Sequence, residues 1–361
     1  MKEDNMKQGW EIIPFEDSIV KVKYTTKVPS NDYLDKGLYP IVSQEEGLVC
    51  GYWNNANDLF KVSTPVVIFG DHTRILKYID FDFVLGADGV KILQPIENIN
   101  AKFLKYYLQY CKIPSLGYSR HYKLLKELQV PVPPLPVQEQ IVSELDLLSG
   151  IIEKKREQLK ELDALAQSIF YDMFGDPITN EKGWEVKKLE QVSTLLNGRA
   201  YKQDELLDSG KYKVLRVGNF FTNSNYYYSD LELDEDKYCD NGDLLFAWSA
   251  SFGAFIWNGG KVIYHYHIWK VLYDNKQLNI DYYRFLLNTM TTYFMKDVHG
   301  IGMVHLTKVG MEQYMLPIPP LPLQHQFATK IEAIEKQKEL IKQSISETET
   351  LFNARMQEHF G

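Results

Sequence analysis

The sequence predicts an α+β protein with two globular domains, each followed by a long α-helix. We expect the two helices to pair as an antiparallel coiled coil within a pseudo-twofold internal repeat. The repeat is the strongest observation, because PVPPLPVQEQ at 131–140 recurs as PIPPLPLQHQ at 317–326, and both copies end in Phe-Gly, at 174–175 and 360–361. A repeat of this period indicates two copies of one structural unit. The length of 361 residues also suits two domains with connecting segments better than one ordinary core.

Each copy of the repeat contains a heptad pattern that is typical of a long amphipathic helix. Positions spaced four and three residues apart over 141–173 are apolar except at Lys155, and the second copy, which starts at Phe327, has Lys338 in the same seam. About 36 residues at 1.5 Å each give helices of roughly 50–55 Å. Because neither helix can bury its stripe alone, we expect the two to pack on each other; the alternative is that each docks separately on its own domain. The second seam is more polar near its end, at Thr348, Arg355 and His359.

Repeated Gly-Trp-Glu triplets, at 9–11 and 183–185, mark the start of each unit. The expected organisation is a first globular domain over 1–130, a first helical arm over 131–175, a linker over 176–183, a second globular domain over 184–316 and a second helical arm over 317–361. Apolar runs predict strands at 65–70, 75–84 and 90–93 and a helix at 101–111 in the first domain. The second domain has comparable runs, which predict strands at 212–219, 242–248 and 261–272 and a helix at 282–295.

The charge distribution separates the helical arms from the two domains. The formal net charge is −8, which is unusual for a nucleic-acid-binding protein. Residues 131–183 alone hold 10 acidic and 5 basic residues, however, so the globular domains are close to neutral. Acidic arms would repel DNA and are better suited to contacts with protein.

Cysteine usage and hydropathy predict a cytoplasmic location. The three cysteines, Cys50, Cys111 and Cys239, have no metal-like spacing and favour a reducing compartment. The first residues, MKEDNMKQGW, lack the apolar core of a signal peptide. No stretch approaches 18 apolar residues, so we expect no membrane contact.

Motifs of catalysis and cofactor binding are missing from the sequence. It has no phosphate-binding loop ending in Gly-Lys-Ser/Thr, and Gly300-Ile301-Gly302 lacks the third glycine of a dinucleotide site. No Cys/His set has zinc spacing, and His265 and His267, which would share one face of a strand, are better explained as surface or interface aromatics. No Asn/Asp-Pro-Pro-aromatic motif of an amino-methyltransferase is present. These observations favour a recognition scaffold without a cofactor.

The doubled motif carries a family resemblance. Pro-Pro-Leu-Pro-x-Gln-x-Gln followed by a long helix ending in Phe-Gly, twice and each time after a globular domain, resembles the specificity (S) subunit of type I restriction–modification enzymes. The stretches FGDHTR at 69–74, GADGVK at 86–91, RVGN at 216–219 and GDLLFAW at 242–248 are similar to target-recognition domains of that family. The resemblance covers almost the whole chain.

The resemblance implies a division of labour between the domains and the helices. Each domain would read one half of a bipartite site in double-stranded DNA, and the helices would set the spacing and dock two methyltransferase (M) subunits. Those subunits would bind S-adenosylmethionine, so the S subunit would need no cofactor of its own and would not be catalytic. Motor–nuclease (R) subunits would complete the restriction enzyme.

Loops rich in basic, amide and hydroxyl side chains are the candidates for DNA contacts, because these groups hydrogen-bond to base edges and phosphates. In the first domain, the candidates are His72, Thr73, Arg74, Ser119, Arg120, His121 and Lys123. A phosphate track over Lys21, Lys23 and Lys27 is a further expectation. In the second domain, the candidates are Arg199, Tyr201, Lys202, Asn219, Ser249, Ser251 and His305. We expect Gly198 to let the backbone approach a phosphate closely.

Several of these residues have a purely structural alternative. Arg74 could pair with Asp71 or Asp80, and Arg120 could form a salt bridge within a short helix near 121–128. The segment 249–252 could be a plain hairpin turn, and Trp248 is better placed in the core than as a stacking platform.

Two other functions compete with DNA recognition by a non-catalytic subunit. One is a chain that itself methylates or cleaves DNA, which the missing motifs argue against. The other is a coiled-coil adaptor whose domains bind protein without DNA specificity, an alternative that the near-neutral domains leave open. Salt-dependent binding to a bipartite duplex would exclude the adaptor.

Overall fold

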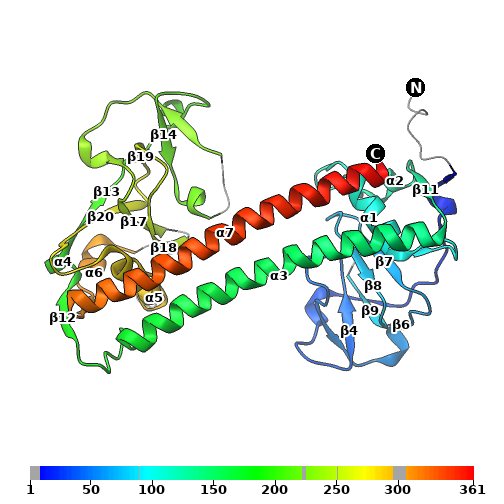
Figure 1. Ribbon diagram of the computed structural model, residues 1–361, viewed down its shortest axis with the longest axis horizontal. Coiled ribbons are helices and arrows are strands. Elements are labelled where there is room, and N and C mark those ends of the chain that lie inside the picture. The colour runs from blue at the N-terminus through cyan, green and yellow to red at the C-terminus, as the bar shows by residue number, and fades with distance from the viewer. Residues whose placement is uncertain (1–8, 88, 222–224, 250, 296–305) are drawn as a thin grey trace. The chain divides into compact units, whose positions relative to one another are not determined.

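The computed structural model describes residues 9–87, 89–221, 225–249, 251–295 and 306–361 (Figure 1). The chain divides into two compact units, one formed by Met1–Arg156 with Lys342–Gly361 and the other by Glu157–Ile341. Each long helix therefore begins in one unit and ends in the other. None of the helices in the described part of the chain combines the length and the apolar character that crossing a membrane requires.

The first unit contains two small sheets and a two-stranded ribbon. Its strands are β1 (Glu11–Pro14), β2 (Ile19–Val20), β3 (Lys27–Val28), β4 (Tyr39–Val42), β5 (Gly51–Trp53), β6 (Leu59–Phe60), β7 (Val66–Gly70), β8 (Leu76–Ile79), β9 (Phe83–Gly86), β10 (Val90–Pro95) and β11 (Gln129–Val132), and its short helices are α1 (Ala101–Tyr110) and α2 (Tyr122–Leu125). One sheet has the order β2-β10-β7-β8 and the other β3-β9-β4-β5, with β6 also paired to β9. Strand β1 pairs with β11.

The second unit repeats this plan. Its strands are β12 (Glu185–Lys188), β13 (Ser193–Asn197), β14 (Tyr212–Leu215), β15 (Tyr227–Ser229), β16 (Tyr238–Cys239), β17 (Leu244–Ser249), β18 (Ser251–Ile256), β19 (Val262–Tyr264), β20 (Ile268–Tyr273) and β21 (Met315–Ile318), and its short helices are α4 (Leu189–Val192), α5 (Ile280–Phe294) and α6 (Lys308–Glu312). The sheets have the orders β13-β20-β17-β18 and β15-β14-β19-β16. The ribbon β12–β21 corresponds to β1–β11, and the parallel pair β14–β19 corresponds to β4–β9. The internal repeat is thereby confirmed at the level of strand pairing.

Two predicted strands are each divided between the two sheets of their unit. The segment 75–84 forms β8 and then β9, and the segment 261–272 forms β19 and then β20. An alternating pattern has the same period on both sides of such a crossing, so it does not show where one sheet ends and the other begins. In the second unit the crossing is a turn at 266–267, directly after the isolated bridge at His265, and His265 and His267 therefore do not share a strand face as expected.

Two 40-residue helices, α3 (Leu135–Phe174) and α7 (Leu321–Phe360), pack on each other (Figure 1). In the first unit Glu144 contacts Arg355 and Lys155 contacts Ser344. In the second unit Asp163 pairs with Lys338 at 2.7 Å, and the rings of Phe170 and Phe327 lie 5.7 Å apart. Residue numbers rise along one helix as they fall along the other, which confirms the antiparallel coiled coil. Each helix also packs on the domains, as Phe170 does against Tyr282 of α5 at 5.9 Å.

The polar residues of the second seam are paired with the first helix. Thr348 Oγ1 accepts a hydrogen bond from Lys155 Nζ at 3.4 Å, and His359 Nε2 lies 2.9 Å from Glu144 Oε2. The final turn is anchored by Phe360, whose ring lies 5.4 Å from that of Phe103 on α1. Helix pairing therefore continues to the C-terminal end of α7, where the sequence is least regular.

A buried glutamine in each copy of the motif ties the long helix to its domain. Gln138 and Gln324 are both completely buried. Gln138 Oε1 accepts the Asn100 N–H at 2.8 Å, and its Nε2 donates to Asn98 O and Pro133 O at 2.8 and 2.7 Å. Gln324 makes the matching bonds, at 2.8 Å each, with the Asn279 N–H, Gln277 O and Pro319 O. Asn100 and Asn279 in turn cap α1 and α5, so one side chain joins the proline-rich segment, the long helix and the start of a domain helix.

Candidate nucleic-acid interface

In the first domain, the structure brings together the two segments that the sequence selected. The backbone N–H of His121 donates to Asp71 O at 2.8 Å, and the Tyr122 N–H donates to Asp71 Oδ1 at 2.7 Å. Asp71 is almost fully buried and also lies 3.8 Å from Lys91 Nζ. The segments 72–74 and 118–123 therefore form one continuous area, called here the first recognition surface.

His121 holds this surface together from inside and is not exposed to a ligand. It is completely buried. The Leu116 N–H donates to His121 Nε2 at 2.9 Å, so Nδ1 carries the ring proton and donates to Asp71 O at 2.8 Å. We therefore revise the expected role of His121 from a DNA contact to a support for the loops that carry the contacts.

A second support comes from the segment behind the loop. Thr73 Oγ1 donates to Gln44 O at 2.7 Å, and the His72 N–H donates to Gln44 Oε1 at 3.1 Å. The segment that carries Gln44 is fixed by Lys77, which is 5 % exposed and donates to Ser43 O and Gly47 O at 2.8 and 2.5 Å. Burial lowers the pKa of Lys77. Sequence reasoning missed this lysine, although a lone basic residue within the half-buried strand 76–79 was a signal for it.

Aromatic, hydroxyl and basic side chains are exposed on the first recognition surface. Tyr118 is 96 % exposed, and its ring stacks on that of His72 with centroids 5.4 Å apart. Ser119, Arg120 and Lys123 are exposed beside it. Lys21, Lys23 and Lys27, the expected phosphate track, are exposed as well.

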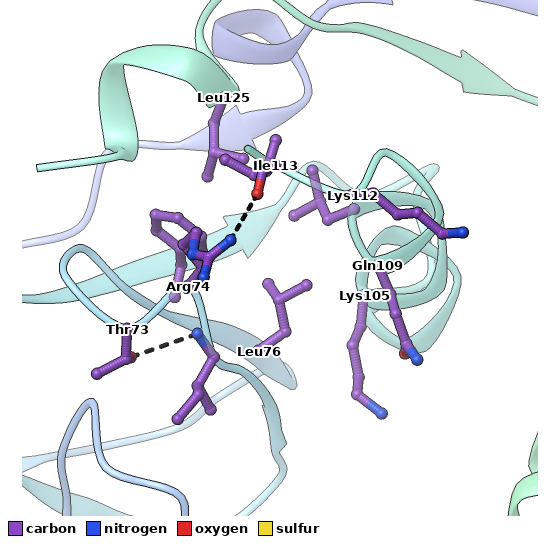
Figure 2. A pocket seen from close by; sticks show the side chains of 11 residues that line it. Thr73, Arg74, Leu76, Lys105, Gln109, Lys112, Ile113 and Leu125 are labelled. Carbon is purple, nitrogen blue, oxygen red and sulfur yellow. Dashed lines mark hydrogen bonds between the residues drawn. The ribbon is translucent and has the colours of Figure 1, made fainter. Parts of the chain in front are cut away.

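Arg74 is turned away from this group. Its guanidinium donates to Ile113 O at 3.0 Å and lies at a pocket beside α1 (Figure 2). Neither of the two carboxylates considered from the sequence is its partner in this bond, since the acceptor is a backbone carbonyl. Its backbone φ of +63° is in the left-handed region, which costs energy for a residue with a side chain.

In the second domain, Arg199 is engaged inside the protein. Its guanidinium forms two hydrogen bonds with Glu205, at 2.8 and 2.7 Å, and lies 5.2 Å from the Tyr201 ring centroid. This arginine, together with the Lys202 N–H, lowers the pKa of Glu205 to about 2. Tyr201 is half-buried, and burial raises its pKa. Of this predicted group, Lys202 is exposed.

Gly198 has a different role from the one expected. A Cβ at this position would lie 2.4 Å from Tyr264 O and 2.4 Å from His265 O. The missing side chain therefore allows close approach of two backbone segments within the domain, rather than approach to a phosphate. This contact places Arg199 beside His265, with which it forms an isolated parallel bridge.

A polar pocket of 210 Å³ lies next to this bridge and is lined by Arg216, Val217, Gly218, Asn219, Asn225, Tyr227, His265 and His267. Asn219 shapes it, because its Oδ1 accepts the Arg216 N–H at 2.8 Å and its Nδ2 donates to Asn225 O at 3.0 Å. Arg216 is exposed over the Tyr227 ring at 5.3 Å. Arg216 stands in the motif RVGN, but it was not among the residues predicted to contact DNA. The sequence feature that points to it is a basic residue directly after a buried strand.

Imidazoles and aromatic rings surround the pocket. Burial, with smaller contributions from His267 and Arg216, lowers the pKa of His265 to about 4. Its ring is therefore neutral near pH 7 and suits a hydrogen bond better than a charge contact. The rings of His265 and His267 are 4.8 Å apart, but no group of three or more metal-ligating side chains occurs within the residues that the structure describes.

The remaining predicted residues lie at the tip of a hairpin. Ser249 ends β17 and is buried, and Ser251 begins β18 and is half-buried. The pairing of Ser249 with Ser251 agrees with the hairpin alternative, and a DNA contact by Ser251 stays a prediction. Trp248 stacks on buried Trp269 at 5.4 Å and donates to Tyr266 O at 2.9 Å, consistent with its expected place against the core. His305 lies outside the described residues.

Comparison with known proteins places the chain in a family. The family model for the type I restriction modification DNA specificity domain matches residues 7–163 and again 181–350. The Type I restriction enzyme MjaVIII specificity subunit of Methanocaldococcus jannaschii is 21% identical, over 92% of this chain and 90% of the relative. The crystal structure of a type I restriction-modification S subunit from M. genitalium shares the fold with a TM-score of 0.58 at 13% identity, over 100% of this chain and 98% of that one. A chain from a structure concerned with complex assembly and conformational transition of the type I R-M system has a TM-score of 0.54 at 14% identity, over 99% and 98%.

The doubled domain match over nearly the whole chain agrees with the doubled strand pairing and the two buried glutamines. The protein therefore belongs to the family of type I restriction–modification specificity subunits.

Proposed function

We propose that each globular domain reads one half of a bipartite site in double-stranded DNA, and that α3 and α7 set the spacing between the half-sites. The observation that carries this proposal is the repeat of one domain plan in two units joined by continuous helices. A tandem repeat of this kind can read two different sequences, because its two copies differ at the side chains of their loops.

The first half-site would be read by the first recognition surface. Arg120 and Lys123 supply charge for phosphates or guanine edges, and Ser119 and Thr73 supply hydroxyl groups for either. The exposed ring of Tyr118 offers apolar area to a thymine methyl or a sugar. Asp71, His121 and Gln44 hold these groups in place, so the exposed side chains stay available for DNA.

The second half-site would be read around the polar pocket. Arg216 lines the pocket and is exposed, Lys202 is exposed in the loop that follows Arg199, and Asn219 fixes the turn that carries Arg216. His265, neutral near pH 7, can donate or accept a hydrogen bond at a base edge. Arg199 would contribute indirectly, because its guanidinium is already occupied by Glu205.

The helices would also dock the methyltransferase (M) subunits, with S-adenosylmethionine bound by those partners and motor–nuclease (R) subunits joining the complex. In support, the exposed sides of the helices carry large apolar residues, with Leu147 65 % and Leu340 60 % exposed. Their acidic character makes protein a better partner than DNA for this surface.

The experiment is methylation mapping in cells that express the chain with its methyltransferase. Arg120→Ala should reduce methylation through loss of the first half-site, and Arg216→Ala through loss of the second, while the other half-site keeps its sequence. Lys61→Ala, which removes an exposed lysine of the first unit outside the segments 72–74 and 118–123, is the control. Equal methylation by all three variants would contradict the proposal, and binding to M subunits without any DNA specificity would favour a coiled-coil adaptor.

The spacing role has a separate test. Inserting four residues, about one helical turn or 6 Å, within 159–166 should lengthen the spacer by about one or two base pairs. Both half-site sequences should stay the same. A changed half-site sequence after the insertion would contradict the spacer role.

A further inference from the structure

The first unit has a pocket beside α1. It has a volume of 470 Å³ and is lined by Phe69, Thr73, Arg74, Ile75, Leu76, Lys105, Leu108, Gln109, Lys112, Ile113 and Leu125 (Figure 2). The two units can be aligned at Asn100 and Asn279, which cap α1 and α5 in the same way. From that point α1 runs for 10 residues and α5 for 15.

In the second unit α5 is longer, and its last turn packs into the core. Phe294, at the end of α5, is completely buried and lies 6.3 Å from Phe246 of the central sheet. Asn288, which corresponds to Gln109, is bonded to both backbone groups of Ala254, at 2.7 and 3.0 Å. In the first unit α1 ends earlier and Gln109 is exposed. The pocket therefore lies open beside Leu108.

Three basic residues line this pocket, and no carboxylate does. Arg74 points toward the Ile113 carbonyl, while Lys105 and Lys112 line the α1 side with their stems and have their ammonium groups turned outward, away from Arg74 (Figure 2). Both lysine side chains have to turn inward to reach a phosphate bound at Arg74. None of the three forms an ion pair within 4.0 Å in the part of the chain that the structure describes. Burial lowers the pKa of Lys105, and the charges of Asp146 and Glu153 oppose this shift.

Backbone strain is concentrated at the same place. Among the described residues, the non-glycine positions with positive φ are Arg74 (+63°), Lys112 (+44°) and Asn180 (+45°), and the first two both line this pocket. Such conformations cost roughly 1–3 kcal/mol each and are found preferentially at functional sites. Here they end α1 early and turn Arg74 inward.

We propose that this pocket binds an organic phosphate of mononucleotide size, with the phosphate at Arg74, Lys105 and Lys112 and the ring on the apolar floor formed by Phe69, Leu76 and Leu108. Guanidinium and ammonium groups are the usual partners of phosphate. The volume lies within the range of small-molecule sites, in which an apolar lining carries a few polar groups. The partial negative charge at the C-terminal end of α1 opposes an anion, but it amounts to about half a charge against three full positive charges.

The pocket adjoins the first recognition surface, because Thr73 and Arg74 belong to that surface and also line the pocket. An extrahelical nucleotide of bound DNA would offer the same chemistry as a free nucleotide. The experiment therefore titrates the full chain without DNA, using AMP, adenosine and inorganic phosphate as probes in isothermal titration calorimetry at low salt.

AMP should bind saturably, and at least about tenfold more tightly than adenosine or phosphate alone, because only AMP uses both halves of the pocket. Lys112→Asn, which keeps a residue that tolerates positive φ, and Lys105→Met should each weaken AMP binding about tenfold. Lys61→Met, an exposed lysine of the same unit outside the pocket, should leave it unchanged. In the unaltered protein, AMP should protect Lys105 and Lys112 from reductive methylation, a readout that does not depend on a variant folding.

Absence of saturable AMP binding, or equal weakening by all three substitutions, would overturn the proposal. Protection of Lys105 and Lys112 by duplex DNA but not by AMP would assign the pocket to the DNA backbone and overturn it as well. Because the titration needs no DNA, it is independent of the proposed function. Failure of half-site recognition would leave the AMP result interpretable.

Discussion

Replacement of Gln138 by leucine should destabilise the first unit, although the residue lies in no recognition surface. The change leaves the Asn100 N–H and the buried Pro133 carbonyl without their partner, together with the carbonyl of exposed Asn98. A buried donor or acceptor without a partner costs about 1–3 kcal/mol. The Asn100 N–H and the Pro133 carbonyl would stay without a partner, while water can replace the lost bond of the Asn98 carbonyl. The free energy of unfolding should therefore fall by about 3 kcal/mol.

The repeat supplies both a replicate and a control. Gln324→Leu removes the same three bonds in the second unit and should cost a similar amount. Gln140→Leu alters the second glutamine of the same motif, which is exposed, and should change the free energy of unfolding by no more than about 0.5 kcal/mol.

Urea unfolding gives the magnitude, and hydrogen exchange gives the location. With a slope of about 2 kcal/mol per molar urea, a loss of 3 kcal/mol moves the midpoint down by about 1.5 M. Amide exchange should accelerate around 98–104 for Gln138→Leu and around 277–283 for Gln324→Leu. If Gln138→Leu and Gln140→Leu unfold at the same urea concentration, the glutamine does not have the role that its hydrogen bonds indicate.

Three further tests, with four substitutions, address the seam, a backbone contact and an ion pair. Lys155→Met replaces an ammonium that contacts Ser344 and Thr348 with an apolar side chain. The change should raise the stability of the helix pair by about 1 kcal/mol, seen as a higher melting temperature. A lower melting temperature would show that the contacts of Lys155 with Ser344 and Thr348 are themselves stabilising. Gly198→Ala should cost about 2–3 kcal/mol in urea unfolding, since its Cβ would lie 2.4 Å from two carbonyl oxygens, whereas Gly150→Ala, at a helical site with open space, should stabilise by about 0.5–1 kcal/mol. Hydrogen bonds from His359 and Arg355 lower the folded pKa of Glu144, so its stabilisation is complete above the unfolded pKa of about 4.3 and is lost as the pH falls through the lower folded value. Glu144→Gln should therefore be less stable than the unaltered chain at pH 7 by about 1 kcal/mol, and the difference should vanish in acid; a difference that persists at low pH would contradict this assignment.

Family membership confirms the prediction of a type I specificity subunit rather than a catalyst. That prediction depended on the combination of PPLP, paired glutamines, a long heptad helix and a terminal Phe-Gly, twice in one chain. The individual DNA contacts stay predictions. Ser119, Arg120, Lys123 and Lys202 are exposed as a contact requires, whereas His121 and Ser249 are buried.

The sequence alone determined the order of domains and helices, because repeat period and heptad spacing are properties of the chain that need no distant partner. It also determined that the two helices pair, since each carries an apolar stripe that must be covered. The places where strands cross between sheets, in 75–84 and 261–272, were not determined, because alternation continues unchanged across such a crossing.

Only the tertiary structure decided which polar residues face outward. His121 and Arg120 are neighbours of similar polarity in the sequence, yet one is enclosed by Asp71 and Leu116 and the other is exposed. Arg199 and Arg216 both follow buried strands. In the part of the chain that the structure describes, the fold brings the carboxylate of Glu205 to Arg199 and not to Arg216. Burial and partner choice depend on how the chain folds back on itself, over 50 residues between Asp71 and His121 and over six between Arg199 and Glu205, and residue type by itself does not encode them.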